Sequence, residues 1–301
     1  MSKTNNYDVI IIGAGYSGLS VALFLGNTRR PIALIDSGNT RNHDVTRSHN
    51  VLGVEGQNPI ILLNTAKKEV SAFSNIKRYA SEAIATEKLK NGEFSVTLAN
   101  SETLFAKKLI LATGLIDCLP NIPGTKDLWP HVLFHCPYCA APDVVDMPLA
   151  VLSDNDEVFF MASVVGKWTK DLVLLTHGQN PLSSEQVNTL KERKVQIVSE
   201  RIIKFELLPN NEVEIHFNNG NTLVRRGIFS HLPFEQRAPS LLSMLKCELT
   251  ENNLVKVDEN YQTNIEGLYA IGDMAMLIQK VTTAIASGTR VGFAIDHVLT
   301  E

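Results

Sequence analysis

The sequence predicts an α/β fold that contains two Rossmann-like strand–helix–strand units. A glycine-rich turn joins an apolar strand to a helix close to the N-terminus, and a second strand–turn–helix–strand pattern lies in the middle of the chain. A further short strand near the C-terminus ends in Gly-Asp. The chain has 301 residues, of which 44% are hydrophobic and 20% are charged, so it is long and apolar enough for two such domains.

Charge and composition exclude several classes of function. The net charge is −4, from 28 basic and 32 acidic residues, whereas a general nucleic-acid binder needs a basic face. The polar segment Met1–Asn6 leads directly into a strand, so we expect no signal peptide, and the apolar runs are too short to cross a membrane. Four cysteines are too few for a disulfide scaffold of this size. We therefore expect a cytoplasmic protein without a nucleic-acid or membrane partner.

The first unit carries a dinucleotide-binding fingerprint in its required context. Tyr7–Ile12 is an apolar run typical of a buried parallel strand, and a helix is expected over Leu19–Leu25. Between them, Gly13 allows a tight turn, Gly15 lets a pyrophosphate approach the backbone, and Gly18 lets helix and strand pack closely. The helix N-terminus offers N–H groups and a positive dipole to phosphates.

An acidic residue completes this fingerprint. Pro31–Asp36 is expected to form the second strand, and its last residue, Asp36, is placed to accept a hydrogen bond from a ribose hydroxyl. Strand, helix and terminal acid together favour a real nucleotide site over an ordinary glycine turn.

Three further elements are expected before the middle of the chain. Ile60–Phe73 has helical spacing with Lys67, Lys68 and Glu69 pointing outward. Short alternating segments over Ile76–Phe105 predict a small antiparallel meander, and Lys108–Ala112 predicts another buried strand.

Cys136 and Cys139 have the C-x-x-C spacing that can close a small disulfide ring. The same spacing can supply half of a zinc site, which would need a second ligand pair. The other two cysteines, Cys118 and Cys247, lack that spacing, and we interpret them as structural or incidental. In a reducing compartment the C-x-x-C pair is expected to be catalytic.

The second unit follows this motif. Pro148–Leu152 and Leu172–Thr176 are expected strands, and Glu157–Val165 is an expected helix between them. Further strands are expected between Val195 and Phe217, and Gly227–Pro233 is expected to form the crossing strand back to the first domain.

The order and spacing of these motifs resemble the flavoprotein disulfide reductases, specifically the low-molecular-weight thioredoxin reductases and their relatives, which include dithiol oxidases of the gliotoxin and holomycin type. The matching residues are Gly13–Gly18, Asp36, Ala112–Gly114, the C-x-x-C pair and Ile271–Asp273. The resemblance implies two Rossmann-like domains of the three-layer ββα type, the second inserted in the first. It divides the chain into an FAD-binding domain at 1–119 and 234–301 and an NAD(P)H-like domain at 120–233.

The resemblance also implies roles for particular residues. Cys139 would face the flavin, and Cys136 would exchange with a thioredoxin-like protein or a small-molecule dithiol. A helix over Thr282–Leu299 would direct its first N–H groups at the flavin, and a homodimer is the family expectation. The residues implied to bind FAD are Gly13, Gly15, Gly18, Asp36, Arg41, Asn42, Asn50, Thr113, Gly114, Gly272, Asp273, Lys280 and Val281.

The chain departs from the family at its second nucleotide turn. Ser153 and Asn155 replace glycines, and Val158 replaces a small residue, so Cβ atoms would obstruct a pyrophosphate. Asp154, Asp156 and Glu157 would repel phosphates, and the strand that ends at Thr176 is followed by no ribose-binding acid. We therefore expect inefficient use of NADPH.

A second departure follows Cys139, where Ala140 and Ala141 stand in place of an acid or a histidine. Acid–base chemistry would then fall to His135, Asp143 or a water. Three functions stay open: a dithiol oxidase that uses oxygen, a thioredoxin reductase supplied by a ferredoxin-type donor, and a flavin-binding redox sensor.

Overall fold

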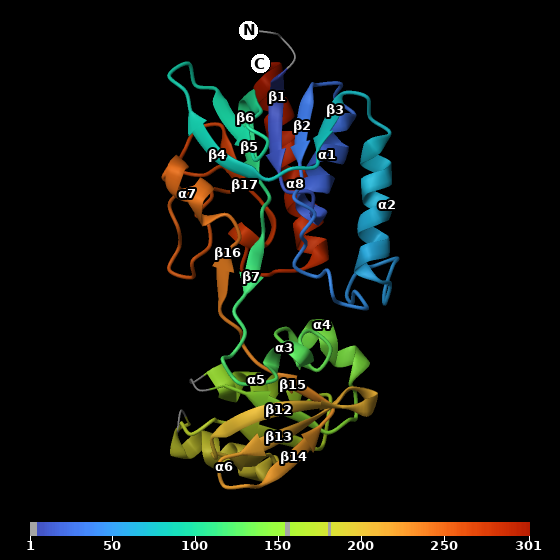
Figure 1. Ribbon diagram of the computed structural model, residues 1–301, viewed down its shortest axis with the longest axis vertical. Coiled ribbons are helices and arrows are strands. Elements are labelled where there is room, and N and C mark those ends of the chain that lie inside the picture. The colour runs from blue at the N-terminus through green and yellow to red at the C-terminus, as the bar shows by residue number, and fades with distance from the viewer. Residues whose placement is uncertain (1–4, 154–156, 180–181) are drawn as a thin grey trace. The chain divides into compact units, whose positions relative to one another are not determined.

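The chain divides into two compact units in the computed structural model, which describes residues 5–153, 157–179 and 182–301. Unit 1 comprises residues 1–46, 51–116 and 234–301, and unit 2 comprises residues 47–50 and 117–233 (Figure 1). The short segment 47–50 therefore packs with unit 2, although its neighbours on both sides along the chain belong to unit 1. Among the described helices, none combines the length and the apolar character that a membrane span requires.

Unit 1 is built on one seven-stranded sheet in the order β3-β2-β1-β6-β5-β4, with β17 paired to β6. The pairs β2–β3, β1–β2, β1–β6 and β6–β17 are parallel, and β4–β5–β6 is antiparallel. The strands are β1 (Asn6–Ile12), β2 (Ile32–Ile35), β3 (Ile76–Tyr79), β4 (Ala83–Lys88), β5 (Phe94–Leu98), β6 (Thr103–Leu111) and β17 (Leu268–Ala270).

The predicted antiparallel meander is confirmed for β4 to β6 and is wrong for β3. Ile76–Tyr79 pairs parallel to β2 because it follows a helical crossover, which returns the chain in the same direction. The predicted strand Lys108–Ala112 is the second half of the long strand β6.

The apolar run at β1 has a direct physical origin. Ile10 and Ile12 pack into one core cluster, and Val9 and Ile11 pack into another, so both faces of the strand are buried. A central parallel strand covered on both faces needs apolar residues at every position rather than at alternate ones.

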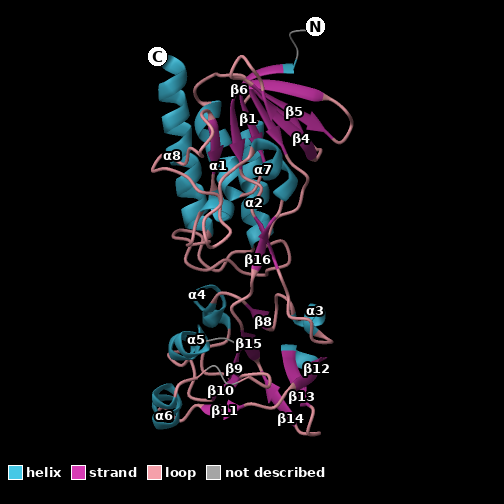
Figure 2. Ribbon diagram, turned by 90° about the vertical axis from the view of Figure 1, so that its left-hand side faces the viewer, coloured by secondary structure: helices cyan, strands magenta, loops and turns pink. Residues whose placement is uncertain are grey.

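Two helices of unit 1 pack unusually closely because glycines line their contact. These are α1 (Tyr16–Gly26) and α8 (Val281–Thr300), which lie side by side in Figures 1 and 2. A Cβ atom on Gly288 would collide with the Ser17 carbonyl, and one on Gly292 would lie 2.6 Å from the Phe24 ring. The remaining helices are α2 (Pro59–Ser71) and α7 (Pro239–Leu245), of which α7 was not predicted.

Unit 2 has the three-layer ββα arrangement that the family resemblance implies. A five-stranded parallel sheet has the order β11-β10-β9-β15-β8, and β12-β13-β14 form a separate antiparallel sheet (Figure 2). The strands are β8 (Leu133–Phe134), β9 (Leu149–Leu152), β10 (Leu172–Leu175), β11 (Gln196–Val198), β12 (Ile202–Leu208), β13 (Glu212–Phe217), β14 (Thr222–Arg225) and β15 (Gly227–Phe229). The helices are α3 (Thr125–Leu128), α4 (Pro137–Ala140), α5 (Glu157–Val165) and α6 (Ser184–Glu192).

The expected role of Gly227–Pro233 is wrong. Its first residues form β15, which lies inside the parallel sheet between β9 and β8, and Ile228 and Phe229 are fully buried there. A Cβ atom on Gly227 would lie 3.1 Å from the Phe134 ring, so this position favours glycine. The return is made instead by β16 (Phe234–Gln236), which pairs with β7 (Leu115–Asp117).

Candidate functional site

The glycine turn of unit 1 is shaped by two close backbone approaches. Gly13 has a φ of +107°, and a Cβ atom there would collide with the Ala112 carbonyl. A Cβ atom on Gly18 would collide in turn with the Gly13 carbonyl. Both glycines are therefore required by the packing of β1, α1 and β6 against one another.

Gly15 differs from these two glycines in a way that indicates a ligand. It is the N-cap of α1 with φ −75° and ψ −171°, an extended conformation open to any residue. A Cβ atom there would meet no protein atom within 4 Å. Neither the backbone nor its neighbours demand glycine, so the open space in front of the helix N-terminus fits a dinucleotide pyrophosphate.

Asp36 lies immediately after β2, as the fingerprint requires. One carboxylate oxygen accepts a hydrogen bond from the Gly38 N–H at 3.1 Å, and the other pairs with Lys67 Nζ at 2.8 Å. The expectation that Lys67 points outward is wrong, because the Lys67 ammonium group on α2 pairs with the Asp36 carboxylate. A carboxylate has about four acceptor positions, so Asp36 retains capacity for a ribose hydroxyl.

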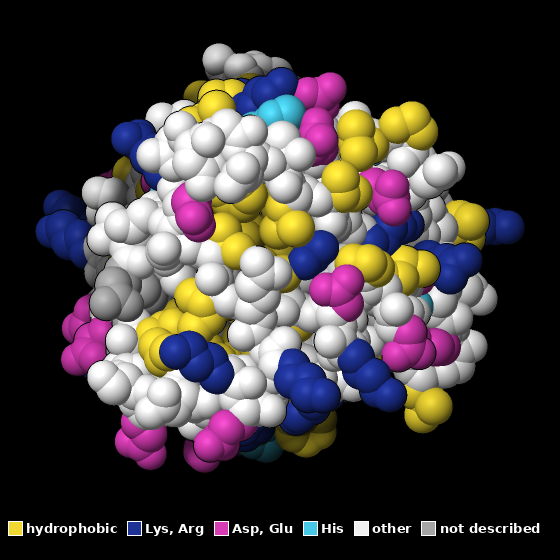
Figure 3. Space-filling view, turned by 90° about the horizontal axis from the view of Figure 1, so that it is seen from below, with side chains coloured by type: hydrophobic (Ala, Val, Ile, Leu, Met, Phe, Trp, Pro, Cys, Tyr) yellow, Lys and Arg dark blue, Asp and Glu magenta, His cyan; other side chains and the backbone are white. Residues whose placement is uncertain are grey.

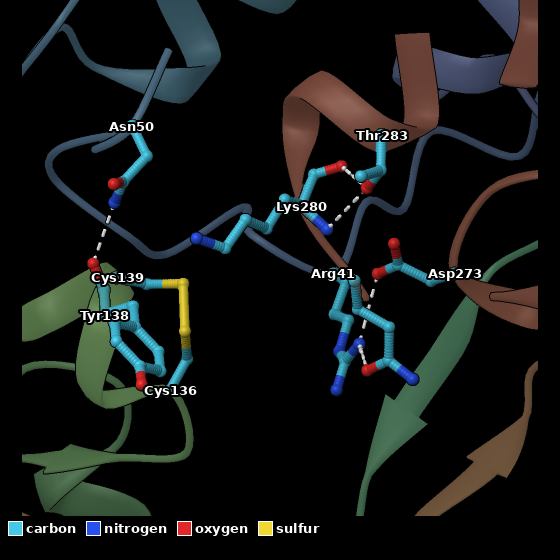
Figure 4. The surroundings of a disulfide bond; sticks show 9 residues. Arg41, Asn50, Cys136, Tyr138, Cys139, Asp273, Lys280 and Thr283 are labelled. Atoms are coloured by element: carbon cyan, nitrogen blue, oxygen red, sulfur yellow. Dashed lines mark hydrogen bonds and ion pairs between the residues drawn. A yellow bond between two sulfur atoms is a disulfide. The ribbon is translucent and has the colours of Figure 1, made fainter. Parts of the chain in front are cut away.

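Arg41 joins two distant parts of unit 1. Its Nη1 atom lies 3.1 Å from Asp273 Oδ2 and donates to Gln279 Oε1 at 2.6 Å (Figure 4). The structure thus brings together Arg41 and Asp273, which were predicted separately, and adds Gln279, which was not. Asn42 lies in the same turn, and its carbonyl accepts from the Val45 N–H.

The turn after β6 carries the next two predicted residues. Thr113 donates to the Met274 sulfur at 3.5 Å, and the Gly114 carbonyl accepts from the Arg237 N–H at 3.2 Å. Gly114 has a φ of +72°, which favours glycine at this turn.

The last predicted residues lie where β17 leads towards α8. Gly272 donates its N–H to the buried Ser287 hydroxyl at 3.2 Å. Lys280 is the N-cap of α8, and its N–H donates to the Thr283 hydroxyl at 3.1 Å (Figure 4). Val281 is the first residue of this 20-residue helix, whose N-terminus provides a positive dipole.

In unit 2, Cys136 and Cys139 form a disulfide with Cα atoms 5.2 Å apart (Figure 4). Cys136 precedes the short helix α4, Pro137 is the first helical residue, and the Cys139 N–H donates to the Cys136 carbonyl at 3.1 Å. Both cysteines are half-buried. The pair is thus closed as a disulfide rather than arranged as half of a zinc site.

Side chains of segment 47–50 contact the C-x-x-C helix and the residues that follow it, and these contacts were not predicted from the sequence. Arg47 Nη1 and His49 Nε2 each lie 3.2 Å from a different oxygen of Asp143, which follows the C-x-x-C helix. The Asn50 amide donates to the Tyr138 carbonyl at 2.8 Å (Figure 4). The His49 side chain is only 8% exposed. Arg47, His49 and Asn50 therefore contact the C-x-x-C turn at Tyr138 and the residue Asp143 that follows it.

Aromatic rings also surround the motif. His135 packs against the Trp129 ring with centroids 5.5 Å apart. Tyr138 is exposed and meets the Trp168 ring edge to face at 5.7 Å. The two rings are tilted by 41°, His135 directly precedes Cys136 in the chain, and the predicted catalytic role of His135 stays a prediction.

The second nucleotide turn follows β9. Ser153 is buried at the strand end, and Val158 is fully buried in the unit 2 core. The predicted obstructions at Asp154, Asn155 and Asp156 lie outside the described residues.

Glu157 and His177, which follow the two strands of the second expected nucleotide unit, each make a contact within unit 2. Glu157, the first residue of α5, pairs with His231 Nδ1 at 2.7 Å. His177, directly after Thr176, accepts a hydrogen bond from the Ile202 N–H at 3.1 Å through Nδ1. The first residue of α5 thus carries a carboxylate, and the imidazole after the second strand accepts a backbone hydrogen bond within unit 2.

A fingerprint turn shaped for a dinucleotide in one unit and a closed C-x-x-C disulfide in the other define a flavin-dependent thiol–disulfide oxidoreductase. The chain belongs to the pyridine nucleotide-disulphide oxidoreductase family, whose sequence model matches residues 7–288. Members related to thioredoxin reductase are FAD-binding flavoproteins, and the open space at Gly15 with the acid at Asp36 fits that cofactor.

Individual relatives agree with this assignment over nearly the whole chain. Thioredoxin reductase sirT of Leptosphaeria maculans is 26% identical over 306 residues, covering 96% of this chain and 93% of the relative. The crystal structure of HlmI matches with a TM-score of 0.93 and 29% identity, covering 100% of this chain and 94% of the other. A putative thioredoxin reductase TrxB from Bacillus anthracis matches with a TM-score of 0.91 and 27% identity over 98% of both chains.

Proposed function

We propose that the protein passes an electron pair between FAD, the Cys136–Cys139 disulfide and an external dithiol or disulfide, and that NADPH is not its efficient electron donor. The Glu157 carboxylate at the start of α5, which contacts His231 Nδ1 at 2.7 Å, is the observation that most directly supports the part of this proposal that concerns NADPH. FAD, bound by the unit 1 residues, would supply two-electron chemistry. The sulfur substrate would be a thioredoxin-like protein or a small dithiol.

The argument against NADPH rests on charge at a helix N-terminus. A pyrophosphate normally uses the free N–H groups and positive dipole there. The Glu157 carboxylate already offers a negative charge to that position, and it would repel a phosphate. His177, the first residue after Thr176, uses Nδ1 in a hydrogen bond to the Ile202 backbone rather than leaving it for a phosphate.

The disulfide chemistry follows from the geometry of the C-x-x-C turn. A substrate thiolate attacks Cys136 Sγ, the bond between the two cysteines breaks, and Cys139 leaves as a thiolate. The second substrate thiol, after losing its proton, attacks the mixed disulfide and releases Cys136. The substrate becomes a disulfide, and the enzyme pair becomes a dithiol that has gained two electrons and two protons. The same steps in reverse reduce a substrate disulfide.

We assign the proton transfer to His49, oriented by Asp143. A carboxylate that holds an imidazole in place is a common arrangement for acid–base catalysis. His49 is buried against Asp143, which follows the C-x-x-C helix, and its neighbour Asn50 binds the Tyr138 carbonyl between the two cysteines.

Asp143→Asn is expected to lower the rate of dithiol oxidation by about 10- to 100-fold, because the imidazole loses its charged partner. Its pH–rate profile should also change shape, which a purely structural loss would not cause. The rate should be measured across pH 5 to 9 with dithiothreitol as the probe. Asp146→Asn, on an exposed residue of the following turn, is the matched control and should behave as the unaltered protein. Equal profiles for both variants would contradict the assignment.

Anaerobic mixing of the oxidised holoprotein with NADPH is expected to leave the flavin absorbance near 450 nm unchanged for minutes. Dithionite added afterwards should bleach the flavin at once, which shows that it is reducible. Rapid bleaching by NADPH would refute the proposal. Glu157→Gln with His231→Asn tests the cause, because removing the carboxylate should increase any residual reduction by NADPH.

The same titration separates the remaining electron partners. Bleaching by a dithiol, followed by reoxidation in air with formation of hydrogen peroxide, would identify a dithiol oxidase. Bleaching by a reduced ferredoxin, with electrons delivered to thioredoxin, would identify a reductase with a one-electron donor. Flavin that stays oxidised with both donors would instead support a sensor without turnover.

A further inference from the structure

We propose that Glu206, Glu214 and His216 form a binding site for a divalent transition-metal cation of the zinc class on the three-stranded sheet of unit 2. The redox proposal above does not use these residues. The proposal is based on the register of two strands, on the distances between the potential ligand atoms, and on one imidazole nitrogen that has no hydrogen-bond partner.

The register of the sheet brings the three side chains together. Strands β12 and β13 are antiparallel, and Glu206 is directly opposite Glu214. His216 lies two residues beyond Glu214, so its side chain leaves the same face of the sheet. One potential ligand atom from each residue lies within 4.8 Å of the others. In the part of the chain that the structure describes, no other group of three such residues gathers its ligand atoms this closely.

The spacing suits tetrahedral coordination. His216 Nε2 lies 3.1 Å from a Glu214 oxygen and 3.5 Å from a Glu206 oxygen. Nitrogen and oxygen ligands bound to zinc at about 2.0–2.1 Å in a tetrahedron are about 3.3–3.4 Å apart. The two observed distances bracket this value, so a cation could be bound with only small movements of the side chains.

The imidazole nitrogen at the centre of the cluster lacks a hydrogen bond. His216 Nε2 is buried and has no hydrogen-bond partner, although two carboxylates lie close to it. Buried polar atoms in folded proteins nearly always have partners, so an unsatisfied one indicates a missing ligand. A cation bound through the lone pair of a neutral imidazole would satisfy this atom.

The charge balance also favours a bound cation. Two carboxylates directly opposite each other on adjacent strands destabilise a sheet. Lys204 Nζ lies 2.8 Å from a Glu206 carboxylate oxygen. The Lys204 ammonium group pairs with Glu206 and not with Glu214. Within the cluster, Glu214 contacts His216 Nε2, the nitrogen that has no hydrogen-bond partner.

The donor set favours zinc over calcium or magnesium. One imidazole nitrogen and two carboxylate oxygens suit zinc and related transition metals, whereas calcium and magnesium prefer six or more oxygen ligands. Three protein ligands leave a fourth position for water. On the face shown in Figure 3, basic and acidic side chains are intermixed.

The test is zinc titration of the tag-free, oxidised holoprotein by isothermal calorimetry and by competition with a chromogenic zinc chelator. Closed as a disulfide, Cys136 and Cys139 cannot bind the metal, and burial raises the pKa of the Cys247 thiol to about 11. We expect one zinc per chain, with no heat from magnesium at the same concentration. His216→Gln and Glu214→Gln should each weaken zinc binding at least 100-fold.

The control is His297→Gln, which removes an exposed histidine paired with Glu301 at 3.2 Å and should leave zinc binding unchanged. Circular dichroism and flavin content verify that each variant is folded, and Glu206→Gln provides a third test if another variant does not fold. Zinc bound at less than half an equivalent would overturn the proposal. So would equal affinities for the unaltered protein and the folded ligand variants.

Discussion

Replacing Cys139 by serine is expected to reduce dithiol oxidation at least about 1,000-fold while FAD remains bound. A serine cannot form the disulfide that Cys139 makes with Cys136, so the enzyme loses its only route for accepting electrons from the substrate through this pair. The flavin residues of unit 1 are unaltered, and the absorbance spectrum should keep its flavin bands. Turnover with dithiothreitol and reduced thioredoxin provides the measurement.

The two cysteine variants should differ in one respect. In Cys139→Ser the remaining Cys136 thiolate is expected to react with an oxidised probe such as 5,5′-dithiobis(2-nitrobenzoate), forming a mixed disulfide and releasing one thiol. Mass spectrometry should find this adduct on Cys136 with a stoichiometry near one. Cys136→Ser should lose turnover equally but trap the probe far more slowly.

Cys247→Ser is the matched control for both. Burial raises the pKa of the Cys247 thiol to about 11, so at pH 7 to 8 it stays protonated and unreactive. Its replacement should change the rate by less than about twofold. A Cys139→Ser enzyme that kept a tenth of the original activity would contradict the redox role of the pair.

Local patterns were sufficient to predict the core strands and the glycine turn. The run at β1 is apolar at every position because both faces are buried, and this pattern is visible without a structure. Each glycine of the turn has a separate packing or ligand reason, and the spacing of the three is a local property of the chain.

Strand pairing was harder to predict because it depends on residues far apart in the chain. Ile76–Tyr79 was expected in the antiparallel meander but pairs parallel to β2, and Gly227–Pro233 was expected as a crossing strand but its first residues pair with β9 inside the unit 2 sheet. A short apolar segment shows that a strand is buried but does not identify the strand beside it.

The surroundings of the predicted site residues were missed for the same reason. Nothing in the sequence near Asp36 indicates that Lys67 will pair with it, and nothing near Asp143 indicates His49. These contacts form only when loops and helices from distant positions meet. Asn50 was expected from family resemblance to lie near the flavin, and the contact seen for its side chain is with the Tyr138 carbonyl.

Gly15→Ala is expected to weaken FAD binding at least about 100-fold with little effect on the fold. The backbone conformation at Gly15 accepts alanine, and the added Cβ atom meets no protein atom within 4 Å. An alanine at a helix N-cap costs less than about 1 kcal/mol relative to glycine. Since the new methyl would displace no atom of the described residues, the expected effect falls on the pyrophosphate proposed to bind there. FAD affinity should be measured by titrating the apoprotein with FAD and following the quenching of flavin fluorescence.

Gly18→Ala separates loss of a ligand from loss of packing. Its Cβ atom would collide with the Gly13 carbonyl, so α1 must move away from β1 at a cost of about 1–3 kcal/mol. We expect the melting temperature of apo Gly18→Ala to fall by several degrees, whereas apo Gly15→Ala should melt within about 2 °C of the unaltered apoprotein. If Gly15→Ala bound FAD normally, the open space at the α1 N-terminus would not be the pyrophosphate site. If it unfolded like Gly18→Ala, glycine at position 15 would be a requirement of the fold rather than of the cofactor.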